Sequence, residues 1–286
     1  MSAFVFLQKV VPQRLITVCA GKLAEIRQPA LKNFLIRLFL RTYKVDMSEA
    51  RIEDPASYES FNKFFTRALK DDARPISAND EELVSPVDGQ ISEMGSMHRG
   101  SLIQAKDIWY SARELLADDI LAARMENGSF ATVYLSPRDY HRVHVPYAGT
   151  LLGITYVPGK LFSVNDTTAR SLDGLFTRNE RIVAQFQTPD FTYALVMVGA
   201  MIVGGMETVV TGTIKRQKHI VELNTGFGRT FSKGEEFGRF HLGSTAIIVF
   251  PAEANVDFHP KLLAGSKIKM GDALGLLPAG NNGGGN

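Results

Sequence analysis

The chain has 286 residues, of which 45% are hydrophobic and 22% are charged. That length can bury a substantial core in one large domain or two smaller ones, and the composition excludes a disordered, collagen-like or coiled-coil chain. The single cysteine, Cys19, excludes a disulfide framework and a cysteine-rich zinc site within one chain, which indicates a reducing cytoplasm.

The net charge of +2 conceals an uneven distribution. Residues 1–45 carry eight basic side chains and one acidic side chain, a net charge of +7, so the rest of the chain has a net charge of −5. This combination is typical of a surface-docking element followed by a working domain. No uncharged apolar run reaches the roughly 18 residues of a spanning helix. No signal peptide is predicted, because Lys9, Pro12 and Arg14 interrupt the first apolar stretch.

Residues 30–44 are predicted to form an amphipathic helix with basic side chains beside its apolar stripe. The stripe consists of Leu31, Phe34, Leu35 and Leu38. An earlier apolar patch lies within residues 4–11. Such a region can lie in an anionic membrane surface with its apolar face in the lipid, or it can pack on the body as an ordinary helix. The pattern alone favours neither interpretation.

A second helix is predicted to begin after Asp54, because an aspartate N-cap followed by Pro55 is a typical helix start. The aromatic residues within 61–65 recur at helical spacing, and residues 71–75 are interpreted as a linker.

From about residue 82 short β-branched runs alternate with turn residues, and a short helix around 107–124 interrupts them. The predicted class is therefore α+β, a helical front followed by a β-rich body. The tail 280–286 is rich in Gly and Asn and is expected to be disordered. The candidate strands are 130–135, 149–157, 192–204, 208–216, 219–224 and 245–250.

Two segments contain charged residues in suggestive settings. Asp88 lies in the turn Ser85–Gly89, where an Asp-Gly pair usually serves the turn alone. His141 and His144 lie beside arginines within residues 136–146, where they could be acid–base groups, anion ligands, metal ligands or simply hydrogen-bonded. A metal site is not favoured, because no nearby cysteine or helical His-Glu pattern supplies further ligands.

Two further segments have equally open interpretations. The loops 158–165 and 176–181 are expected to expose aromatic residues and either line a pocket for a polar head group or serve as ordinary capped loops. In residues 233–245, Gly243 precedes Ser244 just before a predicted strand. Glycine tolerates unusual backbone geometry, so the Ser244 hydroxyl could attack the Gly243 carbonyl with help from a histidine base. A plain β-turn is the alternative.

In this order and spacing, the four segments closely resemble the phosphatidylserine decarboxylase family. The resemblance covers about residues 55–277, including the helix 61–67 and the segment Ala73–Ile76, and is looser in the N-terminal helices. Leu242-Gly243-Ser244-Thr245 resembles the family's self-cleavage motif.

The resemblance implies that Ser244 attacks the Gly243 carbonyl to form an ester. β-Elimination and hydrolysis would then leave a covalent pyruvoyl group in place of Ser244. Asp88, His144 and Ser244 would correspond to the family's triad, with His144 as the base and Asp88 orienting its imidazole. No separate cofactor and no metal are expected.

The same resemblance implies that the chain decarboxylates phosphatidylserine to phosphatidylethanolamine. The substrate amine would form a Schiff base with the pyruvoyl ketone, which then serves as an electron sink. His141 would be the proton donor of this second reaction. Another phospho-serine lipid, such as an ether lipid, would undergo the same head-group chemistry.

A lipid substrate favours the membrane-docking interpretation of the N-terminus. We expect residues 1–75, called the helical front below, to attach peripherally to the cytoplasmic side of the cell membrane. Residues 76–286, called the body below, would form the self-processing decarboxylase domain, with a carrier-like β-sandwich portion. Cleavage would give a β chain ending at residue 243 and an α chain of residues 244–286, held as a heterodimer. The family also implies a homodimer of that unit, and no nucleic-acid partner is expected.

Two other interpretations were weighed against this one. Residues 267–275 resemble the Gly-Asp turn of biotinyl and lipoyl carrier domains, with Lys269 near the place of their modified lysine, so the chain could be a non-catalytic carrier or lipid-binding module. That interpretation leaves Asp88, His141 and His144 unexplained. A pseudoenzyme that binds lipid without processing itself is disfavoured, because all three triad candidates are present.

Overall fold

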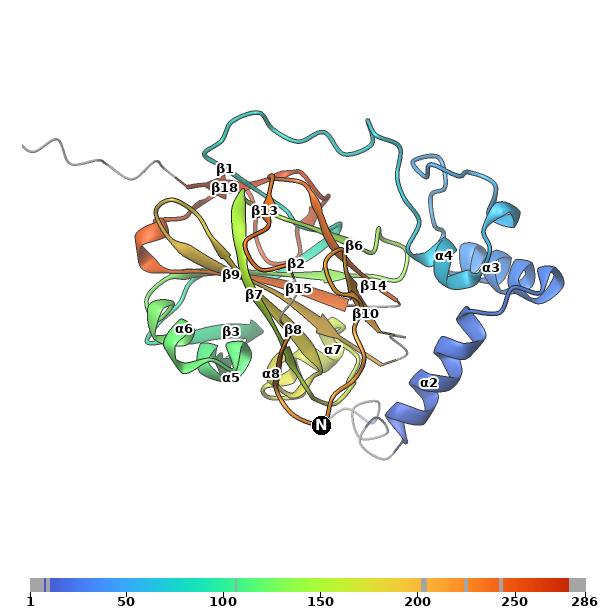
Figure 1. Ribbon diagram of the computed structural model, residues 1–286, viewed down its shortest axis with the longest axis horizontal. Helices are drawn as coiled ribbons and strands as arrows, with labels where there is room; N and C mark the ends of the chain where they lie inside the picture. Colours follow the sequence, from blue (N-terminus) through green and yellow to red (C-terminus); the bar gives the residue numbers. More distant parts are fainter. Residues whose placement is uncertain are drawn as a thin grey trace, which may run out of the picture.

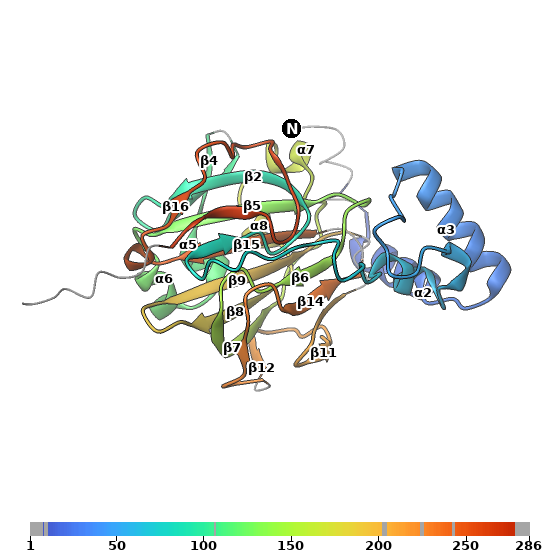
Figure 2. The same ribbon diagram turned by 90° about the horizontal axis from the view of Figure 1, so that it is seen from above.

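The computed structural model of the chain describes residue 8 and residues 11–105, 107–201, 205–223, 226–241 and 244–277. In both views the helical front lies to one side of the β-rich body (Figures 1 and 2). The mixed α+β class is therefore confirmed. Most of the apolar patch at 4–11, Gly243 and the tail 280–286 lie outside the described residues.

The helical front contains α2 (Gln13–Ala24), α3 (Pro29–Tyr43) and α4 (Phe61–Phe65). The helix expected at 30–44 is confirmed as α3. The single helix expected after Asp54 is wrong: a 3-10 turn, η1 (Pro55–Ser57), is followed by extended backbone at Tyr58. Ser60 then caps α4, since its side chain accepts a hydrogen bond from the Lys63 backbone N–H.

Three of the four residues in the apolar stripe of α3 are exposed, whereas Leu35 packs against the apolar cluster of the front. The side chains of Leu31, Phe34 and Leu38 are exposed, and Phe34 is 59% exposed. The residue that α3 buries fully is instead Ile36, which packs with Phe61 and the other aromatic residues of the front. The stripe of α3 is therefore not packed on the body, unlike that of an ordinary core helix.

The body is built on a large antiparallel sheet with the order β12-β7-β8-β9-β15-β5-β2-β17, with β13 paired to β7. Its strands are β2 (Gly89–Ser96), β5 (Ser129–Leu135), β7 (Gly149–Val157), β8 (Arg181–Gln187), β9 (Thr192–Gly199), β12 (Val221–Leu223), β13 (Thr230–Phe231), β15 (Ser244–Phe250) and β17 (Lys267–Ile268).

The centre of this sheet is buried on both faces. In β15 the side chains of Ala246 and Ile248 join one apolar cluster, while Ile247 and Val249 join another on the opposite face. This division follows from the alternation of side chains along a strand. Four short helices supply residues to the second cluster: α5 (Ala112–Leu116), α6 (Asp119–Arg124), α7 (Asp166–Ala169) and α8 (Leu175–Arg178).

A second, smaller sheet packs against the first apolar cluster through Val143, Phe237 and Phe240. Its strand order is β11-β10-β14-β6, and β6 carries His144. The strands are β6 (Arg142–His144), β10 (Met206–Thr208), β11 (Gly212–Thr213) and β14 (Glu236–Phe240). The remaining elements are β1 (Glu82–Val84), β3 (Ser101–Ala105), β4 (Ile108–Ser111), β16 (Asp257–Phe258), β18 (Ala273–Leu276) and the 3-10 turn η2 (Ala252–Ala254).

Most strand predictions for the body are confirmed, with three corrections. The strand expected at 208–216 is a hairpin of β10 and β11, whose turn is closed by the Thr208 hydroxyl. The helix expected around 107–124 begins with β4 and then divides into α5 and α6, where Ala117 adopts a left-handed conformation. The aromatic side chains of the loops around 158–181 are not exposed, since Phe162 and Phe176 are buried in the second apolar cluster.

Candidate functional site

Ser244 is the first residue of β15, at the end of the most deeply buried strand of the body. It pairs with Leu135 of β5 on one side and with Gly199 of β9 on the other. Its side chain is fully buried, and its Oγ has no hydrogen-bond partner among the described residues. A buried hydroxyl normally has a partner. The hydroxyls of Thr245 and of Thr132 on β5 are also buried without a partner among the described residues, so it is the position of Ser244 after Gly243 that makes it the candidate nucleophile.

His141 is likewise fully buried and keeps one nitrogen free. Its Nδ1 lies 2.9 Å from the carbonyl oxygen of Asp139, and its ring lies against Phe65 with 4.0 Å between the ring centroids. Because a carbonyl can only accept, Nδ1 carries the proton and the lone pair belongs to Nε2. That Nε2 has no partner within the described part of the chain. Burial lowers the pKa of His141 to about 3, so the ring is neutral near pH 7.

His144, in contrast, has partners for both ring nitrogens. Its Nδ1 lies 2.8 Å from the Gly234 carbonyl oxygen and its Nε2 lies 3.0 Å from the Tyr140 hydroxyl. Nδ1 therefore donates to Gly234, and Nε2 accepts from Tyr140. Burial lowers the pKa of His144, while burial raises the pKa of Tyr140, so the neutral forms of both are favoured.

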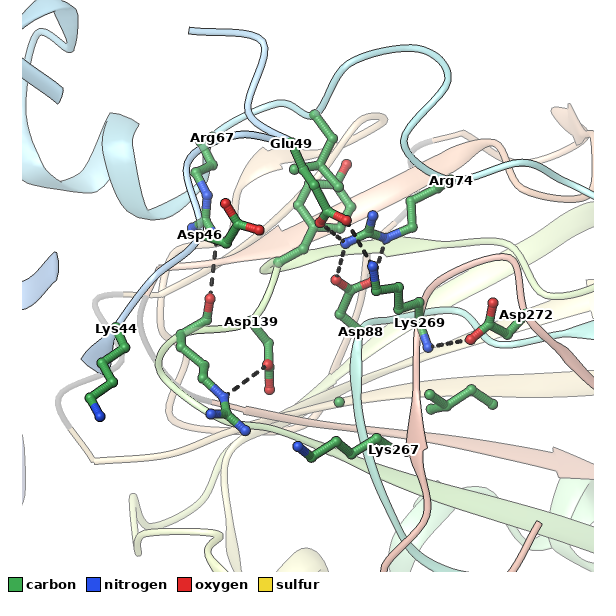
Figure 3. Close-up of a pocket in the computed structure, with 15 residues that line it drawn as sticks. Lys44, Asp46, Glu49, Arg67, Arg74, Asp88, Asp139, Lys267, Lys269 and Asp272 are labelled. Atoms are coloured by element: carbon green, nitrogen blue, oxygen red, sulfur yellow. Dashed lines mark hydrogen bonds and ion pairs between the residues drawn. The ribbon is translucent and has the colours of Figure 1, made fainter. Parts of the chain in front are cut away.

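In this structure the Asp88 carboxylate makes no hydrogen bond to His144, the residue that the resemblance leads us to expect it to orient. The carboxylate accepts hydrogen bonds from Arg74 at 2.9 and 2.5 Å and from the backbone N–H of Met270 at 2.8 Å (Figure 3). The Gly234 carbonyl fixes the imidazole tautomer instead. The two segments are nonetheless adjacent, because the backbone N–H of His144 donates to the Pro86 carbonyl at 2.8 Å.

Arg74 was interpreted from sequence as part of a linker, and that interpretation is incomplete. Its side chain is 5% exposed and joins the body to the helical front, since it contacts Asp88 and also Glu49 at 2.8 Å. Burial alone would lower the pKa of Arg74, but the hydrogen bonds to both carboxylates raise it. The Arg74 guanidinium in turn holds the pKa of Glu49 at about 2.

A second link between front and body ends three residues before Ser244. Nδ1 of His241 lies 2.8 Å from the amide oxygen of Asn62 in α4, and its Nε2 lies 3.2 Å from a carboxylate oxygen of Glu207. The Asn62 amide nitrogen donates to Glu25, the C-cap of α2, at 2.5 Å. Burial lowers the pKa of His241. Sequence reasoning included His241 in its fourth segment but gave it no role.

Within the described part of the chain, no three His, Cys, Asp or Glu side chains are grouped so that they could hold a metal ion. Ser244 and His141 keep free atoms, whereas His144 and Asp88 are engaged by Tyr140 and Arg74.

Comparison with known proteins decides which family this arrangement belongs to. The family model described as phosphatidylserine decarboxylase matches residues 61–276, which include all of these groups. The chain belongs to the phosphatidylserine decarboxylase family. A second family model, described as PSD, matches residues 3–44 of the helical front.

Curated relatives of this family match the chain over nearly its whole length. A phosphatidylserine decarboxylase proenzyme of Psychrobacter arcticus is 48% identical over 96% of this chain and 98% of its own. Proteins of the same name are 47% identical in Legionella pneumophila (strain Lens), over 94% of this chain and 96% of theirs, and 48% identical in Pseudomonas fluorescens, over 96% of each.

The carrier interpretation of residues 267–275 receives no support from this site. The Lys269 ammonium is ion-paired with Glu49 at 2.7 Å, and the decarboxylase model extends across this segment. Gly271 adopts a positive φ of 88° in the turn before β18, where glycine is favoured. A shared turn explains the resemblance without a modified lysine.

Proposed function

We propose that this chain is a phosphatidylserine decarboxylase that processes itself and converts phosphatidylserine to phosphatidylethanolamine. The observation that carries the proposal is Ser244, which lies within the family match over residues 61–276 and whose buried hydroxyl has no partner among the described residues.

Self-processing begins with the bond between Gly243 and Ser244. Ser244 Oγ loses its proton to a base and attacks the Gly243 carbonyl carbon, which replaces the peptide bond with an ester and leaves the Ser244 nitrogen as an amine. Loss of the α-proton of Ser244 then expels the Gly243 carboxylate and leaves dehydroalanine. Water hydrolyses the dehydroalanine to a pyruvoyl group and ammonia.

His144 and His141 are the two bases available for these steps, and the proposal assigns them different roles. His144 takes the Ser244 proton, after Tyr140 releases the Nε2 that it occupies in this structure. Asp88 contributes its negative charge to this side of the site and anchors the loop through Arg74. His141 serves the decarboxylation, because its unpartnered Nε2 can hold or deliver a proton in a water-poor setting.

The pyruvoyl group, when formed from Ser244, supplies a ketone that binds the substrate amine and accepts the electrons left by the departing carboxylate. Two observations fit such a group: Ser244 is buried, and His141 is a neutral histidine whose Nε2 has no partner among the described residues. His141 and the closely packed Phe65 limit water on one side of this site.

The helical front, residues 1–75, is proposed to attach the enzyme peripherally to the cytoplasmic face of the cell membrane. Exposed apolar side chains on α3, together with Leu15 and Val18 of α2, can enter the interfacial layer of a bilayer. The net charge of +7 over residues 1–45 favours anionic lipid. Among the described residues, no helix is long and apolar enough to span a membrane.

The body, residues 76–286, is proposed to form the decarboxylase domain, whose two sheets pack face to face in a carrier-like β-sandwich portion. After cleavage the β chain ends at residue 243 and the α chain comprises residues 244–286. The two chains form a heterodimer, and two such units form a homodimer.

The intact mass of the purified protein under denaturing conditions tests the proposal. Two chains, 1–243 and 244–286, are expected, with a pyruvoyl group in place of Ser244 at the start of the smaller chain. Ser244→Ala removes the nucleophile and should leave a single chain. Ser266→Ala is the matched control, because Ser266 lies in a loop of the body and should not affect cleavage.

Activity completes the test. The cleaved protein should release carbon dioxide from phosphatidylserine in mixed micelles, and Ser244→Ala should not. An uncleaved wild-type chain without activity would contradict the proposal. A cleaved chain that is inactive on phosphatidylserine but active on an ether-linked phospho-serine lipid would contradict only the diacyl substrate.

A further inference from the structure

A pocket with a volume of about 470 Å³ lies where the helical front meets the body, beside the proposed catalytic groups. Its lining comes from separate segments: Lys44 follows α3, Arg67 follows α4, and Lys267 lies in β17 (Figure 3). Asp88 and Tyr140 form part of the same lining. The roles proposed above leave this cavity without an occupant.

Arg67 is the feature of the pocket that calls for a ligand. Arg67 is only 4% exposed. Nevertheless, the Nε and Nη1 atoms of its guanidinium have no hydrogen-bond partner among the described residues. Only Nη2 is engaged, donating to the Arg138 carbonyl at 3.2 Å. Burial lowers the pKa of Arg67, which reflects the cost of holding this charge away from water. A buried guanidinium without a carboxylate partner is unfavourable unless an anion compensates it.

Three further cations of the pocket are free to join Arg67. Lys44 and Lys267 are exposed, and neither ammonium group makes a hydrogen bond or ion pair within the described residues. Arg138 is 52% exposed on its side chain and reaches only 3.9 Å from Asp139. Together these side chains bring three exposed positive charges to a cavity whose lining also contains the buried guanidinium of Arg67.

Among the described residues, no carboxylate of the pocket accepts a hydrogen bond from Arg67, since each already accepts hydrogen bonds from other donors. Asp139 accepts hydrogen bonds from the backbone N–H and the hydroxyl of Ser136, both at 2.7 Å. Asp88 and Glu49 are bound by Arg74. Asp46 accepts from Ser48, and Asp272 accepts from the backbone N–H of Lys269.

We propose that this pocket is a binding site for a phosphate group, with Arg67 as the buried anchor and Lys44, Arg138 and Lys267 as the surrounding cations. A guanidinium that offers two free N–H groups matches two oxygens of a phosphate, and lysines at the rim complete the charge balance. The phosphate belongs either to the head group of an anionic lipid or to a soluble phosphate ester, since both present the same oxygens.

Phosphate binding and self-processing depend on different residues. Self-processing needs Ser244 and a histidine base, whereas phosphate binding needs only the fold at the junction. Binding is therefore measurable on the full chain whether or not it has been cleaved. Failure of one proposal leaves the other intact.

Calorimetric titration of the full chain with inorganic phosphate at low ionic strength tests the site. Saturable binding is expected, with a matching rise in Tm as phosphate is added. Arg67→Met should weaken binding roughly tenfold or more, because it removes two charge-assisted hydrogen bonds. In buffer without phosphate the same variant should be at least as stable as the wild type, since it removes an uncompensated charge.

A second variant tests the site without changing a buried residue, so a loss of binding cannot be attributed to misfolding. Lys44→Gln/Lys267→Gln changes two exposed lysines whose ammonium groups have no partner among the described residues, so it should fold normally and still bind phosphate several-fold more weakly. Arg113→Gln/Arg170→Gln is the control, because it removes the same charge from two exposed arginines elsewhere. Equal phosphate affinity in these two double variants would overturn the proposal, as would the absence of saturable binding in the wild type.

Vesicles then identify the source of the phosphate. Phosphatidylcholine vesicles with and without phosphatidic acid are added to phosphate-loaded protein. Displacement of phosphate by the phosphatidic acid vesicles alone supports a lipid head group as the ligand. Binding of inorganic phosphate and glycerol 3-phosphate that the vesicles do not displace supports a soluble ester.

Discussion

Helix α3 and strand β15 are both rich in large apolar side chains, yet the fold uses them in opposite ways. Phe34 and Leu38 on α3 are 59% and 52% exposed, whereas every residue of β15 is buried. The rest of the protein covers both faces of the strand. By contrast, the rest of the protein covers only one face of the helix. The difference shows that apolar content marks a need for a partner but does not identify that partner.

The two regions are joined by polar contacts and by a small apolar cluster of Leu69, Tyr140 and Met270. Arg74 connects Glu49 of the front to Asp88 of the body, and the apolar cluster around Ile36 is separate from the two clusters of the body. Four predictions test this difference between the two regions, from the largest expected effect on stability to the smallest.

Removing the bridge should have the largest effect. Arg74→Met leaves the nearly buried Asp88 without its charged partner, which should lower the free energy of unfolding by about 3–5 kcal/mol. Denaturant titration measures the change. The double variant Arg74→Met/Asp88→Leu should recover part of the loss, because no charge then stays unpaired. A double variant less stable than the single one would show that the ion pair itself stabilises the junction.

Truncation of the core strand comes next. Ile248→Ala should destabilise the body by about 2–5 kcal/mol, since it opens a cavity in a fully buried cluster. Phe34→Ala, which removes a larger side chain from the exposed stripe of α3, should change the same quantity by only about 0.5 kcal/mol or less. Similar losses for the two variants would mean that protein, and not lipid, covers the stripe.

The buried histidine of the body should make stability depend on pH. Folding lowers the pKa of His141 from 6.5 to about 3, so the unfolded chain binds the extra proton between these values. Stability from this group is complete above about pH 6.5 and is lost as the pH falls toward 3, by at most about 1.4 kcal/mol per pH unit. His141→Gln should flatten the slope of unfolding free energy against pH. His98→Gln, at an exposed position, should leave that slope unchanged.

Substitutions in the exposed stripe of α3 should have the smallest effect on stability but a clear effect on membrane binding. Phe34→Ser/Leu38→Ser should leave the free energy of unfolding nearly unchanged but weaken sedimentation with anionic vesicles by roughly tenfold or more, through loss of buried apolar area. Ile120→Ser is the control, because Ile120 is 72% exposed on the body, away from the front. Equal vesicle binding by both variants would exclude α3 as the membrane contact.

The sequence predicted the framework of the fold well where local pattern is decisive. The run 245–250 gave β15, and the stripe at 31–38 gave α3, because each follows the period of its structure. The division of 55–69 into η1 and α4 escaped prediction, since the Ser60 cap competes with the start at Pro55 and pattern alone does not rank two caps.

The site was predictable only in part, for a related reason. Family motifs identified Asp88, His141, His144 and Ser244, but motif order carries no information about hydrogen-bond partners. Tyr140 sits beside His141 in the predicted segment, yet its bond to His144 depends on the local backbone path. The partners that arrive from other elements, such as Arg74 for Asp88, are fixed by tertiary packing.

The position of β15 between β5 and β9 has a consequence for the cleaved protein. Under the proposed processing, the new α chain would supply an interior strand of the main sheet, its edge strand β17, and two strands of the three-stranded sheet β1-β18-β16. Its contact with the β chain would thus be a domain core, formed before the two polypeptides became separate molecules. Such subunits should copurify through salt, dilution and gel filtration, and mixing the two separated chains should not easily regenerate the enzyme.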